Sequence, residues 1–278
     1  MGVVRRHDRD NTPSTVLLRR SDLAPTNDAL AKLTPLEILR LVWEAFGDRA
    51  AILSSMQRAG TILCHMADRA RLGMDVVFVD TGVLHPETLA TRDELAATHP
   101  HLRVKTLAPL RSFLEQTRAV GLLYLDKEGQ ERCCDLRKSE PLRAVRGQYD
   151  VLVGALRREE GGRRSLVGCV EIDDDLGLLR VHPLAFTTRA ELDRYRETHD
   201  GVVINPLHHL GFATIGCFPC TTPVRPDEDE RAGRWRHLAD VAYCGINPTD
   251  VASEPNGTAV SDRFSAFSQA ALALASSR

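Results

Sequence analysis

Four of the seven cysteines in this chain fall into two close pairs whose spacing suits metal or cluster binding. Cys133 and Cys134 are adjacent, and Cys217 and Cys220 form a Cys-x-x-Cys pair. Four thiolates that converge on one point can hold Zn²⁺ or an iron–sulfur cluster. In a chain with no export signal, such a set indicates ligation rather than disulfide bonding. The spacing leaves the choice between zinc and a cluster open.

The other three cysteines have different surroundings. Cys64 falls on the apolar face of a predicted helix and Cys169 in an apolar stretch, which predicts buried, unreactive thiols. Cys244 follows the predicted globular part of the chain, beside a glycine. That setting suits an exposed nucleophile that is delivered to a site. An idle surface cysteine has equal support from the residues alone.

The elements that would position these thiols alternate along the chain. Helical periodicity begins at residue 35, and short apolar runs follow. The pattern predicts strands at 50–55, 75–80, 103–108, 150–156 and 176–184, and helices at 35–46, 60–72, 85–99, 110–121, 138–147 and 188–200. Apolar strands separated by amphipathic helices predict an α/β fold with a parallel sheet covered by helices on both faces.

We divide the chain into three parts. Residues 1–28 are polar and irregular, which predicts a loosely ordered segment. Residues 29–235 are expected to form the α/β domain, which ends in site-forming loops rich in Gly, Pro, His and Cys. Residues 236–278 are expected to form a C-terminal tail that carries Cys244.

Polar residues follow two of the predicted strands. Ser54 and Ser55 come after the first, in a loop that could hold a phosphate on the amides of the next helix. Asp80, Thr81 and Gly82 follow the second, where Asp and Thr can bind a ribose or a base edge. Ligands of parallel sheets bind at the carboxyl ends of the strands. The alternative is a pair of ordinary capped turns.

Basic residues lie close to the same strand ends and to the cysteine pairs. They are Arg137, Lys138, Arg157, Arg158, Arg231 and Arg234. Such a group could collect phosphate and sulfate oxygens, because guanidinium groups bind these oxygens in bidentate fashion. For any single residue the alternative is a solvated surface position.

The composition excludes several classes of protein. The chain has 278 residues, 43% of them hydrophobic, which suffices for one large domain or two small ones. With 36 basic and 38 acidic residues the formal charge is −2, so no nucleic-acid or membrane partner is expected. No apolar run approaches membrane-spanning length, and residues 1–16 lack the apolar core of a signal peptide. We therefore expect a cytoplasmic protein.

Together these residues resemble a known family. The chain resembles the assimilatory adenylyl-sulfate reductases, the cluster-containing branch of the phosphoadenylyl-sulfate reductase family, from about residue 52 to residue 247. The resemblance rests on the segments at 77–88, 133–143, 205–224 and 228–235. It implies an adenine nucleotide alpha hydrolase-like (PP-loop or HUP-like) fold, so that 29–235 would be a nucleotide-binding reductase domain with an iron–sulfur site.

The resemblance also implies roles for individual residues. A [4Fe–4S] cluster would be bound by Cys133, Cys134, Cys217 and Cys220. Adenylyl sulfate would be held by Ser54 or Ser55, Asp80, Thr81 and Gly82, with its phosphosulfate surrounded by Arg137, Lys138, Arg157, Arg231 and Arg234. The Cys244 thiolate would attack the substrate sulfur, expel AMP and become an S-sulfocysteine. A thioredoxin or glutaredoxin-like dithiol would then release sulfite.

The chain departs from the family pattern at three positions. Tyr243 and Asn247 stand where the tail of the family carries an acidic residue and a histidine, and Ala59 stands where the first loop often carries an acidic residue.

Three other functions compete with this one: an ATP-activating sulfur-transfer or biosynthetic enzyme of the same fold, a non-catalytic nucleotide or cluster sensor, and a plain zinc protein. The first usually shows a Ser-Gly-Gly-x-Asp-Ser loop, which this chain lacks. A homo-oligomer is left open.

Overall fold

The computed structural model describes residues 15–238, 246–250 and 257–278. At its centre the described residues form a sheet with the strand order β4, β3, β2, β5, β7, β6. The strands are β2 (Ala50–Leu53), β3 (Asp75–Val79), β4 (Arg103–Leu107), β5 (Val151–Val153), β6 (Val170–Asp173) and β7 (Leu178–Val181). Neighbouring strands of this sheet are parallel except at one edge, where β6 runs antiparallel to β7. This sheet confirms the predicted α/β class.

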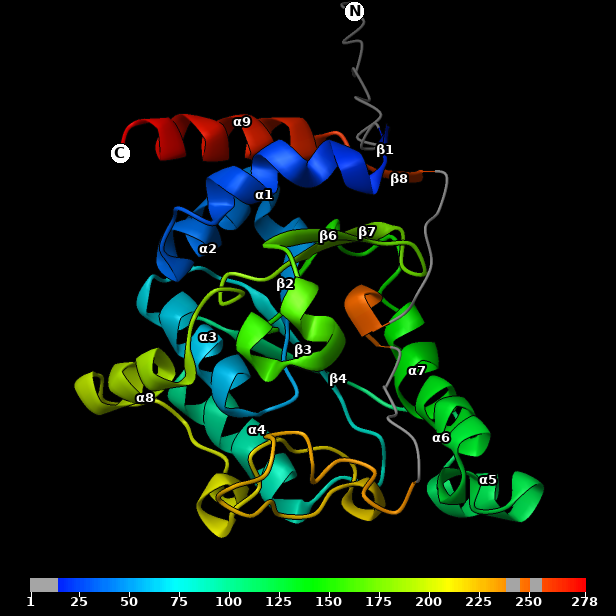
Figure 1. The fold of residues 1–278 in the computed structure, drawn as a ribbon. Helices are drawn as coiled ribbons and strands as arrows, with labels where there is room; N and C mark the ends of the chain where they lie inside the picture. Colours follow the sequence, from blue (N-terminus) through cyan, green and yellow to red (C-terminus); the bar gives the residue numbers. More distant parts are fainter. Residues whose placement is uncertain (1–14, 239–245, 251–256) are drawn as a thin grey trace, which may run out of the picture.

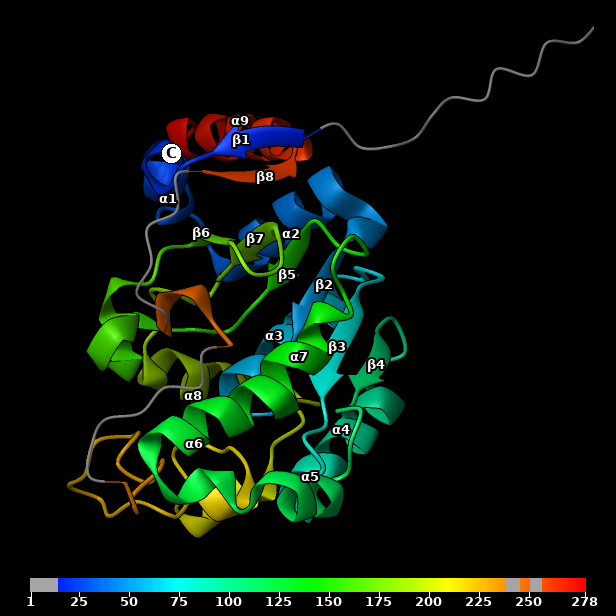
Figure 2. The ribbon, with the colours of Figure 1, turned by 90° about the vertical axis from the view of Figure 1, so that its right-hand side faces the viewer.

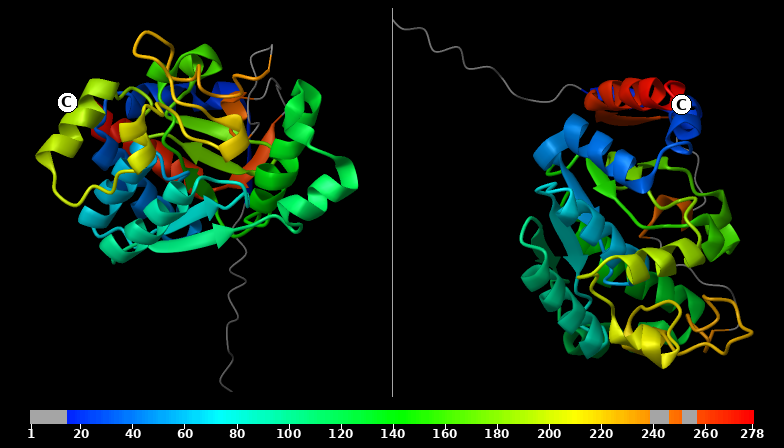
Figure 3. Two further views of the ribbon diagram at one scale, coloured as in Figure 1. Left: turned by 90° about the horizontal axis from the view of Figure 1, so that it is seen from below. Right: turned by 90° about the vertical axis from the view of Figure 1, so that its left-hand side faces the viewer.

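The order of the strands creates a crevice at the centre of the sheet. From β2 the chain proceeds outward to β3 and β4, and it then adds β5 and β7 on the other side of β2. Ligands of open α/β sheets bind at such a point, outside the carboxyl ends of the strands. The loops of residues 205–238, coloured yellow to orange, gather at the lower end of the molecule in Figure 1 and in the right-hand view of Figure 3.

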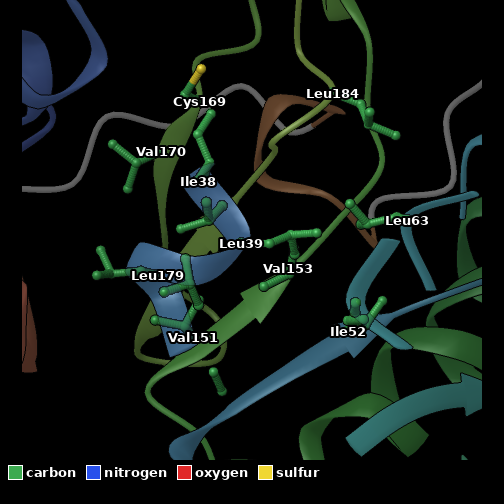
Figure 4. Packing of buried hydrophobic residues seen from close by; sticks show 14 of the residues in the cluster. Ile38, Leu39, Ile52, Leu63, Val151, Val153, Cys169, Val170, Leu179 and Leu184 are labelled. Carbon is green, nitrogen blue, oxygen red and sulfur yellow. The ribbon is translucent and has the colours of Figure 1, made fainter. Parts of the chain in front are cut away.

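Both faces of the sheet are buried along the inner strands β2, β3, β5 and β7, as the continuous apolar strands predict, whereas the edge strand β4 is mostly exposed. Successive strand residues face opposite sides, so Ile52 packs in one apolar cluster and Ala51 in another. The first cluster is covered by α2 (Pro35–Phe46) and α3 (Arg58–Arg69), and Figure 4 shows their side chains against the strands. The second is covered by α7 (Glu140–Arg143) and the residues that follow it.

Three further helices match their predicted ranges to within a few residues. They are α4 (Pro86–Thr98), α5 (Phe113–Val120) and α8 (Arg189–Thr198). Two of them begin with a capping box, in which the side chains of Ser112 and Glu115 open α5 and those of Thr188 and Glu191 open α8. These boxes explain why the helices begin where they do.

The adjacent cysteines lie at the end of a helix, in the stretch between the predicted helices at 110–121 and 138–147. Helix α6 (Lys127–Cys134) ends at the pair, and a turn of π-helix at Asp135–Ser139 follows before α7. A π turn widens the helix locally and is often found at functional sites. Within the predicted range 138–147 only α7 is α-helical, and the π turn lies between α7 and the cysteines.

The two ends of the chain pack against each other. Strand β1 (Thr15–Leu18) pairs antiparallel with β8 (Thr258–Ser261), and α9 (Arg263–Ser276) contacts both α1 (Ala24–Leu30) and α2. Figures 1 and 2 show this layer above the edge of the main sheet. The structure thus differs from the predicted irregular segment 1–28 from residue 15 onward. Each segment finds its partner at the opposite end of the chain, which a local pattern does not reveal.

None of the described helices is long enough to cross a lipid bilayer. The longest of them, α9, has 14 residues, whereas a membrane-spanning helix needs about 20. The apolar side of α9 faces the protein, where Phe264, Phe267 and Ala271 are buried.

A Phe267→Ala variant should unfold at lower denaturant than the natural protein. Phe267 is fully buried, and its ring centroid lies 5.8 Å from that of Phe46 on α2. Removal of a buried Phe costs about 3–5 kcal/mol of unfolding free energy. Urea denaturation measures this loss, and Leu272→Ala, at a 40% exposed position of the same helix, is the matched control. Equal stability of the two variants would show that α9 is not packed on the core.

Candidate functional site

A cavity of about 210 Å³ opens at the centre of the sheet, where β2, β3 and β5 end. Its wall brings together most of the residues that the sequence singles out for anion or nucleotide binding. They are Ser54, Ser55, Thr81, Lys138, Arg157, Arg231 and Arg234. The carboxyl-end position is the expected one for a ligand of this kind of sheet. We call it the strand-end cavity.

The loop between β2 and α3 forms one side of the strand-end cavity. The buried hydroxyl of Ser54 accepts a hydrogen bond from the Met56 amide at 3.2 Å, so it stabilises the loop itself. The first amide of α3, on Arg58, donates to Nε2 of His208 at 3.0 Å. His208 therefore occupies the amide that a phosphate would be expected to use.

His208 is a residue that sequence reasoning missed. Its Nδ1 lies 2.7 Å from the Phe212 carbonyl oxygen. Because a carbonyl oxygen can only accept a hydrogen bond, Nδ1 must carry the proton and donate it. This fixes the tautomer, so that Nε2 is the acceptor for Arg58. Burial lowers the pKa of His208, which keeps the ring neutral. The sequence signal was only its place in the loop-rich stretch after Asn205.

The turn after β3 connects the strand-end cavity to the cysteines. Thr81 lines the cavity, and its hydroxyl lies 3.3 Å from the sulfur of Cys217. Asp80 is turned away from the cavity wall and accepts a hydrogen bond from the Gly82 amide at 2.8 Å. Gly82 has φ +71°, and a Cβ there would lie 2.9 Å from Arg137 Nη2. Asp80 and Gly82 therefore shape the turn, whereas Thr81 faces the ligand space.

The four predicted thiol ligands line one small cavity of about 20 Å³ beside the larger one. Cys133 and Cys134 come from the end of α6, and Cys217 and Cys220 from a 3₁₀ turn at Phe218–Cys220. A backbone bridge between Leu84 and Cys217 holds this turn next to the loop after β3. The indole of Trp235 packs beside the cysteines. We call this space the thiol cavity.

Polar groups surround the sulfurs. The side-chain amide of Gln130 donates to Cys134 at 3.1 Å, and that of Gln116 to Cys133 at 3.6 Å. The ammonium of Lys138 lies 3.9 Å from Cys134. Such donors stabilise thiolates and tune a bound metal or cluster. Burial, the largest effect, raises the pKa of Cys220 to about 11, so a bound cation would be needed to keep this thiol ionised.

The spacing of the thiols bears on which group they could hold. A tetrahedral zinc site would place its sulfur ligands within about 4 Å of one another. Among the described residues, no group of three or more His, Cys, Asp or Glu side chains is arranged to hold a metal ion. A [4Fe–4S] cluster binds its four cysteines at separate irons, so its sulfur ligands lie farther apart. The described residues that line the thiol cavity offer four thiols and no histidine or carboxylate, a donor set that both groups accept.

The predicted cations divide between the two cavities. Lys138 lines both cavities, so a ligand in the strand-end cavity that contacts Lys138 would lie next to the cysteines. Arg137 is buried and lines the thiol cavity instead, where it donates to the Thr81 carbonyl oxygen and to Gln116 Oε1. Arg137 thus lies behind the turn at Thr81, and its expected contact with substrate stays a prediction.

The remaining arginines are held by carboxylates and an aromatic ring. Arg157, 4% exposed, lies 2.6 Å from Glu159 and 3.4 Å from Glu230. Arg231 and Arg234 both lie over Trp235, with Arg234 Cζ 4.3 Å from the ring centroid. Arg158, which the sequence grouped with these residues, stacks on Phe186 outside the wall of the strand-end cavity.

Several residues of the strand-end cavity carry no clear sequence signal. Glu230 forms ion pairs with Arg189, at 2.8 Å, and with Arg157. Its carboxylate therefore pairs with two arginines that could otherwise bind a substrate anion. Ile246 and Asn247 also line the cavity, and they belong to the predicted tail. Cys244 and Tyr243 lie outside the described residues.

Comparisons with known proteins show the family of this chain. Residues 49–223 match the family described as the phosphoadenosine phosphosulfate reductase domain. An adenosine 5′-phosphosulfate reductase of Streptomyces coelicolor is 40% identical over 78% of this chain and 90% of its own. That of Mycolicibacterium smegmatis is 35% identical over the same shares. A phosphoadenosine 5′-phosphosulfate reductase of Gloeobacter violaceus is 34% identical over 77% of this chain and 89% of its own.

A solved structure has the same fold. The phosphoadenylyl-sulfate reductase of Candida auris, determined as a phosphate complex, aligns with a TM-score of 0.63 at 21% sequence identity. The alignment covers 75% of this chain and all of that one. At this identity the likeness concerns the arrangement of strands and helices.

Proposed function

This chain belongs to the phosphoadenosine phosphosulfate reductase family, and from that premise we propose that it reduces adenylyl sulfate to sulfite and AMP in sulfate assimilation. The observation that carries the proposal is the shared wall of the two cavities. Lys138 and Thr81 line the strand-end cavity and also contact the sulfurs of Cys134 and Cys217. A nucleotide bound at the strand ends would therefore present its phosphosulfate beside the thiol cavity.

The proposed reaction uses Cys244 as the nucleophile. Its thiolate attacks the sulfur of the sulfuryl group, a sulfur–sulfur bond forms, and the bond between that sulfur and the phosphate oxygen breaks. AMP leaves with the electron pair, and Cys244 becomes an S-sulfocysteine. A thiolate of an external dithiol then attacks the Cys244 sulfur and expels sulfite, and the second thiol of that dithiol resolves the mixed disulfide. The dithiol supplies both electrons.

Cations at the strand-end cavity offset the repulsion between thiolate and sulfuryl group. Lys138, Arg231 and Arg234 line the wall on the side of the cysteines. Positive groups placed where negative charge develops stabilise the transition state and the AMP that leaves. Arg157 joins them when its partner Glu230 gives way to the substrate anion.

Sequence position supports the choice of Cys244. Ile246 and Asn247 line the strand-end cavity, and Cys244 precedes Ile246 by two residues. Because an extended chain spans at most about 3.6 Å per residue, two residues reach about 7 Å. The other two cysteines that are not cluster candidates, Cys64 and Cys169, are buried and have pKa values raised by burial to about 12.

The four remaining cysteines are proposed to bind a [4Fe–4S] cluster. The supporting features are the four sulfurs around one cavity and the hydrogen bonds from Gln130, Gln116 and Thr81 to them. When bound, the cluster supplies a fixed charge distribution beside Lys138 and joins α6 to the turn at Phe218–Cys220. The transfer of the sulfuryl group requires no electron from it.

The reductant and the location follow from the chemistry. An S-sulfocysteine is released by a low-potential dithiol, so the proposed partner is thioredoxin or a glutaredoxin-like protein. Such dithiols are kept reduced in the cytoplasm, which is the location that we propose.

The test is mass spectrometry of the anaerobically purified protein after incubation with adenylyl sulfate and no reductant. We expect an added SO₃ group on the peptide that contains Cys244, and its release as sulfite when reduced thioredoxin is added. A protein that binds AMP and retains its iron but forms no adduct would contradict the proposal. That outcome would favour the sensing function over catalysis.

A further inference from the structure

A group of buried charges lies outside both cavities, on the edge strand β6 and its neighbour β7. Arg180 is 1% exposed, and its Nε donates to Asp173 Oδ2 at 2.7 Å. Glu171 lies directly across the antiparallel ladder from Arg180, and its carboxylate is 3.2 Å from His182 Nε2. Burial of such charges is costly, and they are often retained because they specify a geometry.

Both Arg180 and Glu171 bind one short segment of the tail. Nη2 of Arg180 donates to the Ile246 carbonyl oxygen at 3.0 Å. The hydroxyl of Thr249 donates to the Glu171 carboxylate, at 2.6 Å from Oε2. Two neighbouring strands thus fasten residues 246–250 at points three residues apart. We call these five residues the anchor segment.

The Glu171 carboxylate is suited to this task. Burial, the largest effect, raises its pKa, but hydrogen bonds from His182 and Thr249 and the charges of His182 and Arg20 outweigh it, so that the pKa is lowered. The side chain is therefore an ionised acceptor at neutral pH, and hydrogen bonds to charged groups are among the stronger ones.

The anchor segment also borders the strand-end cavity. Ile246 packs against the apolar cluster beneath α7 and lines the cavity together with Asn247. The carbonyl that Arg180 holds belongs to this same residue. Because Cys244 lies only two residues earlier in the chain, a fixed Ile246 limits the distance between the Cα atoms of the two residues to about 7 Å.

We propose that Arg180 and Glu171 are positioning residues for the sulfuryl transfer, because they dock the anchor segment and so keep the Cys244 thiol within reach of the bound nucleotide. The proposal rests on the proposed function of Cys244. Arg180 and Glu171 lie outside the described wall of the strand-end cavity, so they act through the anchor segment and not on substrate.

Thr249 offers the cleanest test. Thr249→Val removes the hydroxyl that donates to Glu171 and keeps nearly the same shape, whereas Thr249→Ser retains the hydroxyl. With saturating adenylyl sulfate and no reductant, we expect Thr249→Val to form the Cys244 adduct about tenfold more slowly, the typical effect of losing a hydrogen bond to a charged group. Thr249→Ser should restore the rate, and the AMP dissociation constant should not change in either variant.

Hydrogen exchange provides a readout that does not depend on the chemistry. The backbone amides of the anchor segment, which has none at Pro248, should exchange faster in Thr249→Val and in Arg180→Lys, in which the guanidinium donor to the Ile246 carbonyl oxygen is lost. Natural exchange and a natural adduct rate in Thr249→Val would overturn the positioning role. So would a loss of AMP binding as large as the loss of adduct rate, because that indicates a damaged cavity. If the natural protein forms no adduct, the proposed function fails first.

Discussion

A Cys244→Ser variant is expected to form no sulfite from adenylyl sulfate, while it still binds AMP and keeps its iron. The hydroxyl of serine is far less acidic than a thiol and forms no sulfur–sulfur bond with the sulfuryl group, so loss of the nucleophile should cost on the order of 10⁴-fold or more in rate. The cations that line the strand-end cavity belong to other segments of the chain. Sulfite release with reduced thioredoxin and AMP binding by calorimetry measure the two effects separately.

The other cysteines provide matched controls for this variant. Cys64 and Cys169 are buried thiols outside both cavities, and Cys64→Ala and Cys169→Ala should keep sulfite formation and adduct mass. Sulfite formation by Cys244→Ser within tenfold of the natural rate would assign the nucleophile elsewhere. Loss of AMP binding in the same variant would indicate that the residue supports the cavity rather than the chemistry.

The parallel core of the fold could be predicted because its pattern is local. Strands β2, β3 and β5 are runs of mostly apolar residues buried on both faces, and β2 and β3 are each followed after a short loop by a helix, α3 or α4. Strand β6 was missed because it is short and pairs antiparallel with β7 through a tight turn after Asp173. Its charged residues Glu171 and Asp173 hid the apolar alternation.

The ends of the chain could not be predicted, because each is stabilised by the other. The four residues of β1 have their partners at Thr258–Ser261, and α1 finds its apolar neighbours on α9. Taken alone, each segment is too short and too polar to indicate an ordered element. Only the tertiary contact between residues more than 200 positions apart makes them regular.

The candidate site was predicted by strand-end reasoning but not in its details. That rule placed Ser54 and Thr81 correctly at the cavity, because carboxyl ends of parallel strands share an edge. It could not tell that Asp80 caps its own turn or that Arg137 faces the cysteines, since the direction of a side chain depends on its tertiary partners. Glu230 and His208 come from long loops whose path no periodicity describes.

A Cys134→Ser variant is expected to be colourless, to contain almost no iron and to form no sulfite. Two donors are aimed at this sulfur, the amide of Gln130 at 3.1 Å and the ammonium of Lys138 at 3.9 Å. A serine oxygen is a harder and far less acidic ligand than a thiolate, so it replaces cysteine poorly at iron. Loss of the cluster would also leave Lys138 without the charge beside it and would disconnect α6 from the turn at Phe218–Cys220.

Iron and zinc analysis of the natural protein and of this variant distinguishes an iron–sulfur cluster from a zinc site. The natural protein should contain about four irons per chain if all four cysteines bind one cluster, and its visible absorbance should disappear in Cys134→Ser. Cys64→Ala, a buried thiol outside the thiol cavity, should keep both. Zinc in place of iron in the natural protein would establish the plain zinc site. A Cys134→Ser protein that keeps its iron and its absorbance would remove Cys134 from the ligand set, and a stable, active variant without iron would show that sulfite formation does not need the cluster.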